Sequence, residues 1–144
     1  MTVAIRSATP ADWPAIRRLL ETSDLPLAGA EVWLASFVIA ERNDEIVGCA
    51  TLEEHDGAFL LRSVAVSREL RGARIGEQLV AAALDAVRRR GGGPVFLLTT
   101  TAAKWFPRFG FRRIGREELP ESLTASEELR GACPATAVTM ALNV

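Results

Sequence analysis

The residues between positions 64 and 76 have the types and the spacing of a phosphate-binding loop. An apolar run, Val64-Ala65-Val66, is followed by a short polar link, and Arg71-Gly72-Ala73-Arg74-Ile75-Gly76 then opens an apolar-periodic helix over residues 79–87. A strand that leads through glycines into a helix turns several backbone N–H groups toward one point, where the helix dipole also favours negative charge. The pattern therefore predicts a phosphorylated cofactor.

Two common nucleotide-binding loops do not fit this segment. A Walker loop needs Gly-Lys-Ser/Thr at the start of the helix, whereas Gly76 is followed by Glu77 and Gln78. The dinucleotide fingerprint needs three spaced glycines and a following βαβ unit with an acidic ribose-binding residue, and the sequence has neither. What remains is an Arg-Gly-x-x-Ile-Gly loop.

This loop, preceded by Val-Ala-Val, resembles the coenzyme A loop of the GNAT acetyltransferase superfamily. A second motif strengthens the resemblance, because residues 97–101 read Leu-Leu-Thr-Thr-Thr and are followed by Trp105-Phe106 and Gly110-Phe111. GNAT enzymes usually show an aromatic pair and a Gly-Phe at these places. The two motifs lie in the family's order and the resemblance covers nearly the whole chain.

Weaker sequence similarities point to particular subfamilies of that superfamily. The run that continues to Leu119-Pro120 looks like the acetyltransferase domain of N-acetylglutamate synthases. Over its full length, with the ending Arg130-Gly131-Ala132-Cys133-Pro134, the chain resembles small acetyltransferases associated with arsenic-resistance operons more closely. The resemblance implies transfer of an acetyl group from acetyl-CoA to an amine.

The expected cofactor contacts follow from the same resemblance. In the family, the strand corresponding to residues 64–66 splays from the strand corresponding to residues 95–99, and the pantetheine arm lies in the gap. An amide near Val64 is then the expected oxyanion donor, which makes Val64 a catalytic candidate. The expected cofactor-binding residues are Val64, Ala65, Val66, Arg71, Gly72, Ala73, Arg74, Ile75, Gly76, Thr99 and Phe106.

Two positions depart from the family pattern. The fourth loop residue is usually glycine, which permits positive φ and close backbone approach, but here it is Arg74. Its guanidinium either meets a phosphate oxygen or points to solvent, and the sequence leaves both open. Many GNAT enzymes carry a tyrosine that acts as the general acid for the leaving thiolate where this chain has Phe106, and the chain contains no tyrosine. Because a coenzyme A thiol is a fair leaving group, losing this acid is expected to cost about 10²-fold or less.

The candidate general base is Glu53. Some family members place a glutamate early in the strand that enters Val-Ala-Val, where this chain has Leu60. If the chain turns at Asp56-Gly57, Glu53 lies opposite Leu60 on the neighbouring strand. The alternative is an exposed acid beside a hairpin turn. Glu54, on the opposite face, is the fallback, and His55, the only histidine, is expected in the turn.

Two arginines are candidates for binding an acceptor carboxylate. Arg62 follows the alternation of Val64 and Val66, and a cation in an apolar strand needs a partner. That partner is either a substrate carboxylate held bidentately or an internal acid such as Glu53. Arg130 is a further candidate that can equally be a solvated surface charge.

Composition and periodicity predict one α+β domain over residues 1–144, with helices on a mixed, mostly antiparallel sheet, which is the element order of the GNAT fold. A helix is expected from Thr9-Pro10-Ala11-Asp12 onward, and the helix after the loop should stop at Gly91. Shorter helices are expected at residues 30–36 and 100–108. The expected strands are residues 3–7, 37–41, 46–54, 58–66, 95–99, 111–114 and 137–142.

Charge and cysteine content narrow the function classes. A net charge of −1 shows none of the excess of basic residues that is typical of nucleic-acid-binding proteins. No apolar run approaches the length of a membrane span, and the first residues have no signal-type core, so a cytoplasmic protein is expected. Cys49 and Cys133 are too few for a disulfide framework, and no metal site is expected.

The leading hypothesis is an N-acetyltransferase that uses acetyl-CoA and a small, amino-acid-like amine, such as a glutamate analogue or an arsenical toxin. The alternatives are an N-acetylglutamate synthase-like enzyme, a non-catalytic acyl-CoA-binding sensor, and an arsenical-binding accessory protein that relies on Cys133. The expected partner is a small molecule rather than a nucleic acid or a membrane. The oligomeric state is open, with a homodimer among the options.

Overall fold

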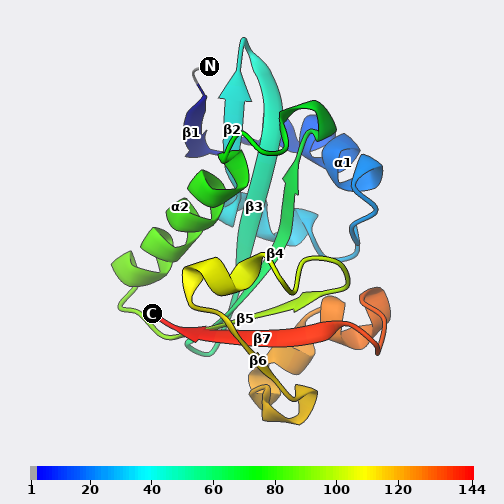
Figure 1. Cartoon of the computed structure of the whole chain (residues 1–144), viewed down its shortest axis with the longest axis vertical. Helices are drawn as coiled ribbons and strands as arrows, with labels where there is room; N and C mark the ends of the chain where they lie inside the picture. Colours follow the sequence, from blue (N-terminus) through cyan, green and yellow to red (C-terminus); the bar gives the residue numbers. More distant parts are fainter. Residues whose placement is uncertain (1–2) are drawn as a thin grey trace.

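The computed structural model describes residues 3–144, whose strands form one seven-stranded sheet in the order β1-β2-β3-β4-β5-β7-β6 (Figure 1). Neighbouring strands are antiparallel except β4 and β5, which are parallel. The expected α+β class with a mixed, mostly antiparallel sheet is confirmed. The strands are β1 (Ala4–Ser7), β2 (Val38–Arg42), β3 (Glu45–His55), β4 (Ala58–Val66), β5 (Pro94–Thr99), β6 (Arg112–Ile114) and β7 (Val138–Asn143).

Two α-helices cover opposite faces of the sheet (Figure 1). Helix α1 (Trp13–Thr22) packs against a face that includes Cys49, whereas α2 (Ile75–Arg89) packs against a face that includes Ala50. These two neighbours on β3 point to opposite sides because side chains alternate along a strand. The remaining helical segments are short, namely Pro10–Asp12, Glu31–Ser36, Arg68–Leu70, Phe106–Phe109, Arg116–Glu118, Glu121–Ala125 and the π-type Glu128–Ala132.

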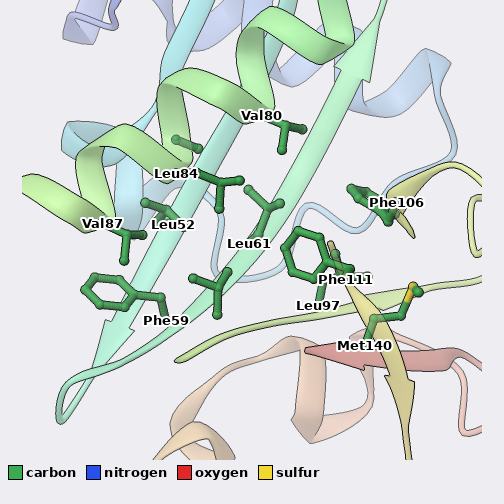
Figure 2. Packing of buried hydrophobic residues seen from close by; sticks show 12 residues of the cluster. Leu52, Phe59, Leu61, Val80, Leu84, Val87, Leu97, Phe106, Phe111 and Met140 are labelled. Atoms are coloured by element: carbon green, nitrogen blue, oxygen red, sulfur yellow. The ribbon is translucent and has the colours of Figure 1, made fainter. Parts of the chain in front are cut away.

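The largest apolar cluster joins α2 to the centre of the sheet. Figure 2 shows helix side chains Val80, Leu84 and Val87 facing strand side chains such as Leu52 and Leu61. Burying a side chain of this size stabilises a protein by about 1.5–3 kcal/mol. Because the loop at residues 71–74 leads directly into α2, this packing also fixes the loop relative to β4.

Strands β4 and β5 pair only over a short stretch and then diverge. Their registered pairs are Phe59 with Val95 and Leu60 with Phe96, although β4 continues to Val66 and β5 to Thr99. In Figure 1, β5 runs away from the upper part of β4. The expected splay between these two strands is therefore present.

A β-bulge in β4 accompanies the divergence. Cys49 pairs with Ala65 and Thr51 pairs with Arg62, so Ser63 and Val64 together lie opposite the single residue between them on β3. Ser63 has a φ of 60°, in the left-handed region. A bulge of this kind leaves an extra residue outside the ladder and increases the local twist.

The bulge overturns one expectation from the sequence. Val64 and Val66 pack beside Ile75 on the α2 side of the sheet, whereas Arg62 points to the other face, where it meets Glu53. The prediction that Arg62 follows the alternation of the two valines is wrong, because the extra residue resets the alternation between them.

Most expected elements are found within two residues of their predicted ends, with two differences. The helix expected at residues 100–108 reduces to a short 3₁₀ segment, Phe106–Phe109, which ends at Gly110 with a φ of 98°. The hairpin turn consists of Asp56 and Gly57, both with positive φ, and His55 ends β3 instead of lying in the turn. No helix formed by residues 3–144 is long and apolar enough to cross a membrane.

Candidate functional site

A cleft of about 1040 Å³ opens where β4 and β5 diverge. This volume is slightly above the range of about 300–1,000 Å³ that is typical of small-molecule sites. One end of the cleft is formed by the loop before α2, the middle by β4 and β5, and the other end by Arg62 together with Glu128 and Cys133. The cleft thus brings together three groups of residues that lie far apart in the sequence.

The loop end has the features of an anion site. Gln78 makes the first backbone bond of α2, to the Arg74 carbonyl at 3.2 Å, and within residues 3–144 the N–H groups of residues 74–77 have no backbone acceptor. Free N–H groups at a helix start favour negative charge. Arg71 and Arg74 also line this end of the cleft and add positive charge, whereas Arg108 is paired there with Glu77 at 2.7 Å.

The loop residues occupy distinct backbone and packing positions. Gly72 has a φ of 93°, which favours glycine. A Cβ at Gly76 would lie 3.1 Å from a ring carbon of Trp105, so this position keeps the aromatic side chain close to the helix. Arg74 is exposed and caps α2 with a φ of 65° and a ψ of 18°. The conformation is therefore the one for which the family uses glycine, and a phosphate contact of the Arg74 guanidinium stays a prediction.

The middle of the cleft is bounded by Val64 and Val66 on one side and by Thr99 and Phe106 on the other. Thr99 Oγ1 accepts a hydrogen bond from the Ala102 N–H at 2.9 Å, which shapes the chain after β5. Phe106 is buried against Trp105, with ring centroids 4.9 Å apart. A largely apolar passage of this kind suits a flexible arm better than a charged group.

Two of the predicted cofactor-binding residues lie outside the wall of the cleft. Ala65 packs in the cluster under α1, on the face opposite Val64 and Val66. Ala73 is exposed in the loop and is not part of the lining. A role for either residue in binding would have to come from its main chain.

Glu53 is buried at the centre of a polar network. Its side chain is 1% exposed, and it lies opposite Leu60 as predicted. One carboxylate oxygen is 2.7 Å from His55 Nε2, and the other accepts hydrogen bonds from Arg62 Nη1 at 2.9 Å and from Ser126 Oγ at 3.2 Å. The alternative of an exposed acid beside the turn is wrong, because the bulged sheet and the segment that contains Ser126 enclose this position.

Arg62 is fully enclosed, with a side chain 0% exposed. Besides Glu53, it donates from Nη2 to the Pro26 carbonyl at 3.1 Å and from Nε to Ser63 Oγ at 3.2 Å. Its Nε also lies 3.4 Å from Glu128 Oε2. The internal pair weighed in the sequence is thus present, and a second carboxylate shares the same cation.

Glu128 is the site residue that the sequence did not identify. It is 4% exposed and lines the cleft, and its Oε1 atom has no hydrogen-bond partner among the described residues. Burial raises the pKa of this carboxyl to about 7, with Arg62 opposing the rise and Glu53 adding to it. Its position could not be inferred, because residue 128 lies in an irregular segment far from β3 and β4 in sequence.

The Cys133 thiol lies at the same end of the cleft. It is 8% exposed, and burial, followed by the nearby Glu128 carboxyl, raises its pKa to about 12. A thiol with such a pKa is protonated at neutral pH and a poor soft-metal ligand. Among the described residues there is no group of three or more His, Cys, Asp or Glu side chains that could hold a metal ion.

The other candidates lie apart from the cleft. Arg130 is exposed, donates from Nε to the Thr124 carbonyl at 3.0 Å and does not line the cleft, so its role in substrate binding stays a prediction. Glu54, the fallback base, forms a surface pair with Arg90 at 3.1 Å. His55 reaches the network only through Glu53 and packs against Trp33 with its edge.

Comparison with known proteins places this geometry in context. Residues 33–113 match the family model described as acetyltransferase (GNAT) domain. The amino-acid acetyltransferase of Neisseria meningitidis is 32% identical over 129 residues, which cover 83% of this chain and 30% of that protein. The chain thus spans less than a third of the length of this curated relative.

Solved structures agree over nearly the whole chain. The N-acetylglutamate synthase from Neisseria gonorrhoeae, complexed with coenzyme A and N-acetyl-glutamate, is 27% identical with a TM-score of 0.85, over 99% of this chain and 35% of that chain. Rv2747 from Mycobacterium tuberculosis, in complex with CoA and NLQ, is 25% identical with a TM-score of 0.81, over 98% of this chain and 99% of that chain.

Replacing Arg74 by glycine is expected to raise the free energy of unfolding by about 0.5–1 kcal/mol, because it removes a side chain from the left-handed region. Arg74→Ala is the matched control, since it removes the guanidinium but keeps the Cβ and should give no such gain. Denaturant unfolding of both variants measures the difference. Equal stabilities of the two variants would contradict strain at this position.

Glu128 is expected to make stability depend on pH. Its carboxyl holds a proton up to about pH 7 in the folded chain but only to about pH 4.5 in the unfolded chain, so its contribution to stability falls as pH rises between these values. The unfolding free energy of the wild type minus that of Glu128→Gln should therefore drop by about 1–3 kcal/mol across this interval. The matched control is Glu127→Gln, which removes the carboxylate of an exposed neighbour instead of a buried one.

Proposed function

Because this chain belongs to the GNAT acetyltransferase family, we propose that it transfers an acetyl group from acetyl-CoA to the amine of a small, amino-acid-like substrate. One observation carries the proposal: a single cleft connects an anion-binding loop, a gap between diverging strands and a buried charged network. These three parts match the phosphates, the pantetheine arm and the reacting groups of such a reaction in order.

The cofactor end would hold the phosphates of acetyl-CoA. Free N–H groups at the start of α2 and the side chains of Arg71 and Arg74 supply donors for phosphate oxygens. The pantetheine arm would lie between residues 64–66 and Thr99, beside Phe106. The complexes of the two structural neighbours with coenzyme A support this assignment.

The reacting carbonyl would lie beside the bulge in β4. Ser63 and Val64 fall outside the regular register with β3 and beyond the last pair with β5. A main-chain N–H at Val64 can therefore be directed at the oxygen that becomes negative when the amine attacks. Removing one such donor typically costs about 10²–10³-fold in rate.

The acceptor would enter at the end formed by Arg62 and its neighbours. Amino-acid-like acceptors are supported by the names of the relatives. The Arg62 side chain is 0% exposed and bonded to Ser63, Glu53 and Pro26, so its grip on a substrate carboxylate stays a prediction. Glu53 remains the sequence-based candidate for the base, although its two oxygens already accept bonds from His55, Arg62 and Ser126. Phe106 supplies no proton for the thiolate, so water or another side chain must do so.

A second candidate function is a non-catalytic acyl-CoA sensor. It is favoured by Phe106 and Leu60, which stand where many family members carry an acid and a base. A cytoplasmic location, a homodimer and a link to arsenic resistance also stay predictions, since no described contact bears on them.

The experiment that tests the function is thiol release from acetyl-CoA across free amino acids, glutamate analogues including arsenic- and phosphorus-containing ones, polyamines and peptides. Release with α-amino acids or their analogues is the expected result. Tight acetyl-CoA binding without release across the whole panel would favour the sensor. Release only with peptides or polyamines would contradict an amino-acid-like acceptor.

Gly72→Asp is expected to weaken acetyl-CoA binding at least about tenfold, because it places a carboxylate in the loop proposed to hold phosphates. The matched control is Gly91→Asp, at the far end of α2. Both glycines have similar φ values, 93° and 103°, and open space where a Cβ would lie. Calorimetry measures both affinities, and an equal effect of the two substitutions would refute the loop assignment.

A further inference from the structure

We propose that Glu128 docks the acceptor amine and removes its proton before the amine attacks the acetyl group. This inference rests on the proposed function, because it assigns a role within the same cleft. It differs from the expectation based on the sequence, which placed the base on β3 at Glu53.

The geometry at Glu128 calls for a hydrogen-bond donor from a ligand. Oε2 lies 3.4 Å from Arg62 Nε, whereas Oε1 is buried and has no partner in the described part of the chain. Buried carboxylate oxygens are normally satisfied, so an unpaired one next to a binding cleft is an exception that needs a cause. The N–H groups of an amine bound in the cleft would supply the missing donors.

The other carboxylates at the cleft are less suited to this role. Glu77 lies at the loop end and is paired with Arg108 at 2.7 Å. Asp24 is exposed, so its charge is well solvated. Glu53 is satisfied on both oxygens and does not form part of the cleft wall. Only Glu128, among the described acids that line the cleft, combines burial with a free oxygen.

The backbone around Glu128 is fixed from two sides. Its N–H donates to Ser126 Oγ at 3.2 Å, and the same hydroxyl donates to Glu53 Oε2 at 3.2 Å. Its carbonyl accepts a bond from the Cys133 N–H at 3.2 Å. These bonds fix the backbone without using the carboxylate, whose neighbours are Arg62 Nε at Oε2 and the Cys133 thiol. Oε1 has no hydrogen-bond partner among the described residues, which leaves that atom free to meet a substrate.

The charges that face Glu128 suit a group that takes up a proton near neutral pH. Arg62 on β4 favours the ionised form, Glu53 on β3 disfavours it, and the Cys133 thiol favours it slightly, while burial has the largest effect and brings the pKa to about 7. A general base is most effective when its pKa lies near the working pH. An arriving ammonium group would be attracted to the ionised form and would deliver its proton there.

The proposed step balances in atoms and charge. The Glu128 carboxylate takes one proton from the ammonium group, which leaves a neutral amine with its lone pair. The amine nitrogen then forms a bond to the acetyl carbon, and the bond from that carbon to sulfur breaks. The coenzyme A thiolate receives the second proton lost by nitrogen, directly or through water, and Glu128 returns its proton to solvent when the product leaves.

The kinetic test compares Glu128→Gln with Glu127→Gln, the exposed neighbour. At pH 7, Glu128→Gln is expected to lower kcat/KM about 10²–10⁴-fold with little change in acetyl-CoA affinity. In the wild type, kcat/KM is expected to rise with pH near pH 7 as Glu128 ionises. In Glu128→Gln this rise should disappear, and the rate should instead follow ionisation of the acceptor amine. Glu127→Gln should match the wild type, and a wild-type rate and pH profile for Glu128→Gln would overturn the proposal.

A second measurement does not depend on turnover. In wild-type protein labelled with ¹³C at glutamate carboxyls, the resonance missing from Glu128→Gln should titrate near pH 7 and shift when L-glutamate is added with coenzyme A. No titration above about pH 6, or no response to any amine of the panel, would overturn the proposal. A shift without acetyl transfer to any amine would instead support amine docking at Glu128 and contradict the proposed function.

Discussion

The divergence of β4 from β5 is the constraint on which the site depends. Two parallel strands that stayed paired would leave no room between them, whereas here the pairing ends at Leu60 and Phe96 and the cleft begins. The bulge at Ser63–Val64 resets the side-chain alternation of β4 at the same place. The bulge thus turns two valines toward α2 and leaves Arg62 on the opposite face, next to the gap that begins where the pairing of β4 with β5 ends.

Apolar packing holds the loop before α2 in a fixed position relative to the gap between β4 and β5. Helix α2 lies across β3 and β4 through a cluster that includes Val80 and Leu61 and extends to Phe106 beyond β5 (Figure 2). Because the loop is the start of the same helix, the free N–H groups have a fixed direction relative to the strands. Positioning of two reactants is among the largest contributions to transfer reactions, and this core supplies the rigid frame for it.

A network of buried charged side chains lies at the end of the cleft opposite the loop. Arg62 is shared by two carboxylates, Glu53 and Glu128, and none of the three side chains is more than 5% exposed. Burial is the main cause of the raised pKa of the Glu128 carboxyl, and the Arg62 charge opposes the rise while the Glu53 charge adds to it. Removing one partner from such a group is costly, so the network has to be considered as a unit. Glu128 gives the cleft an acid whose pKa of about 7 lets it change protonation near neutral pH.

The sheet-and-helix order, the hairpin that sets Glu53 opposite Leu60 and the loop that precedes α2 could all be predicted from the amino-acid sequence, because they depend on local periodicity and turn chemistry. The sequence also shows that no tyrosine can act as a general acid. Other features of the site depend on how distant segments pack. A one-residue bulge has no clear signal in an apolar strand, so the face of Arg62 was predicted wrongly. The place of Glu128 depends on how an irregular segment folds back over β3 and β4, and burial and long-range pairing exist only once the chain has folded.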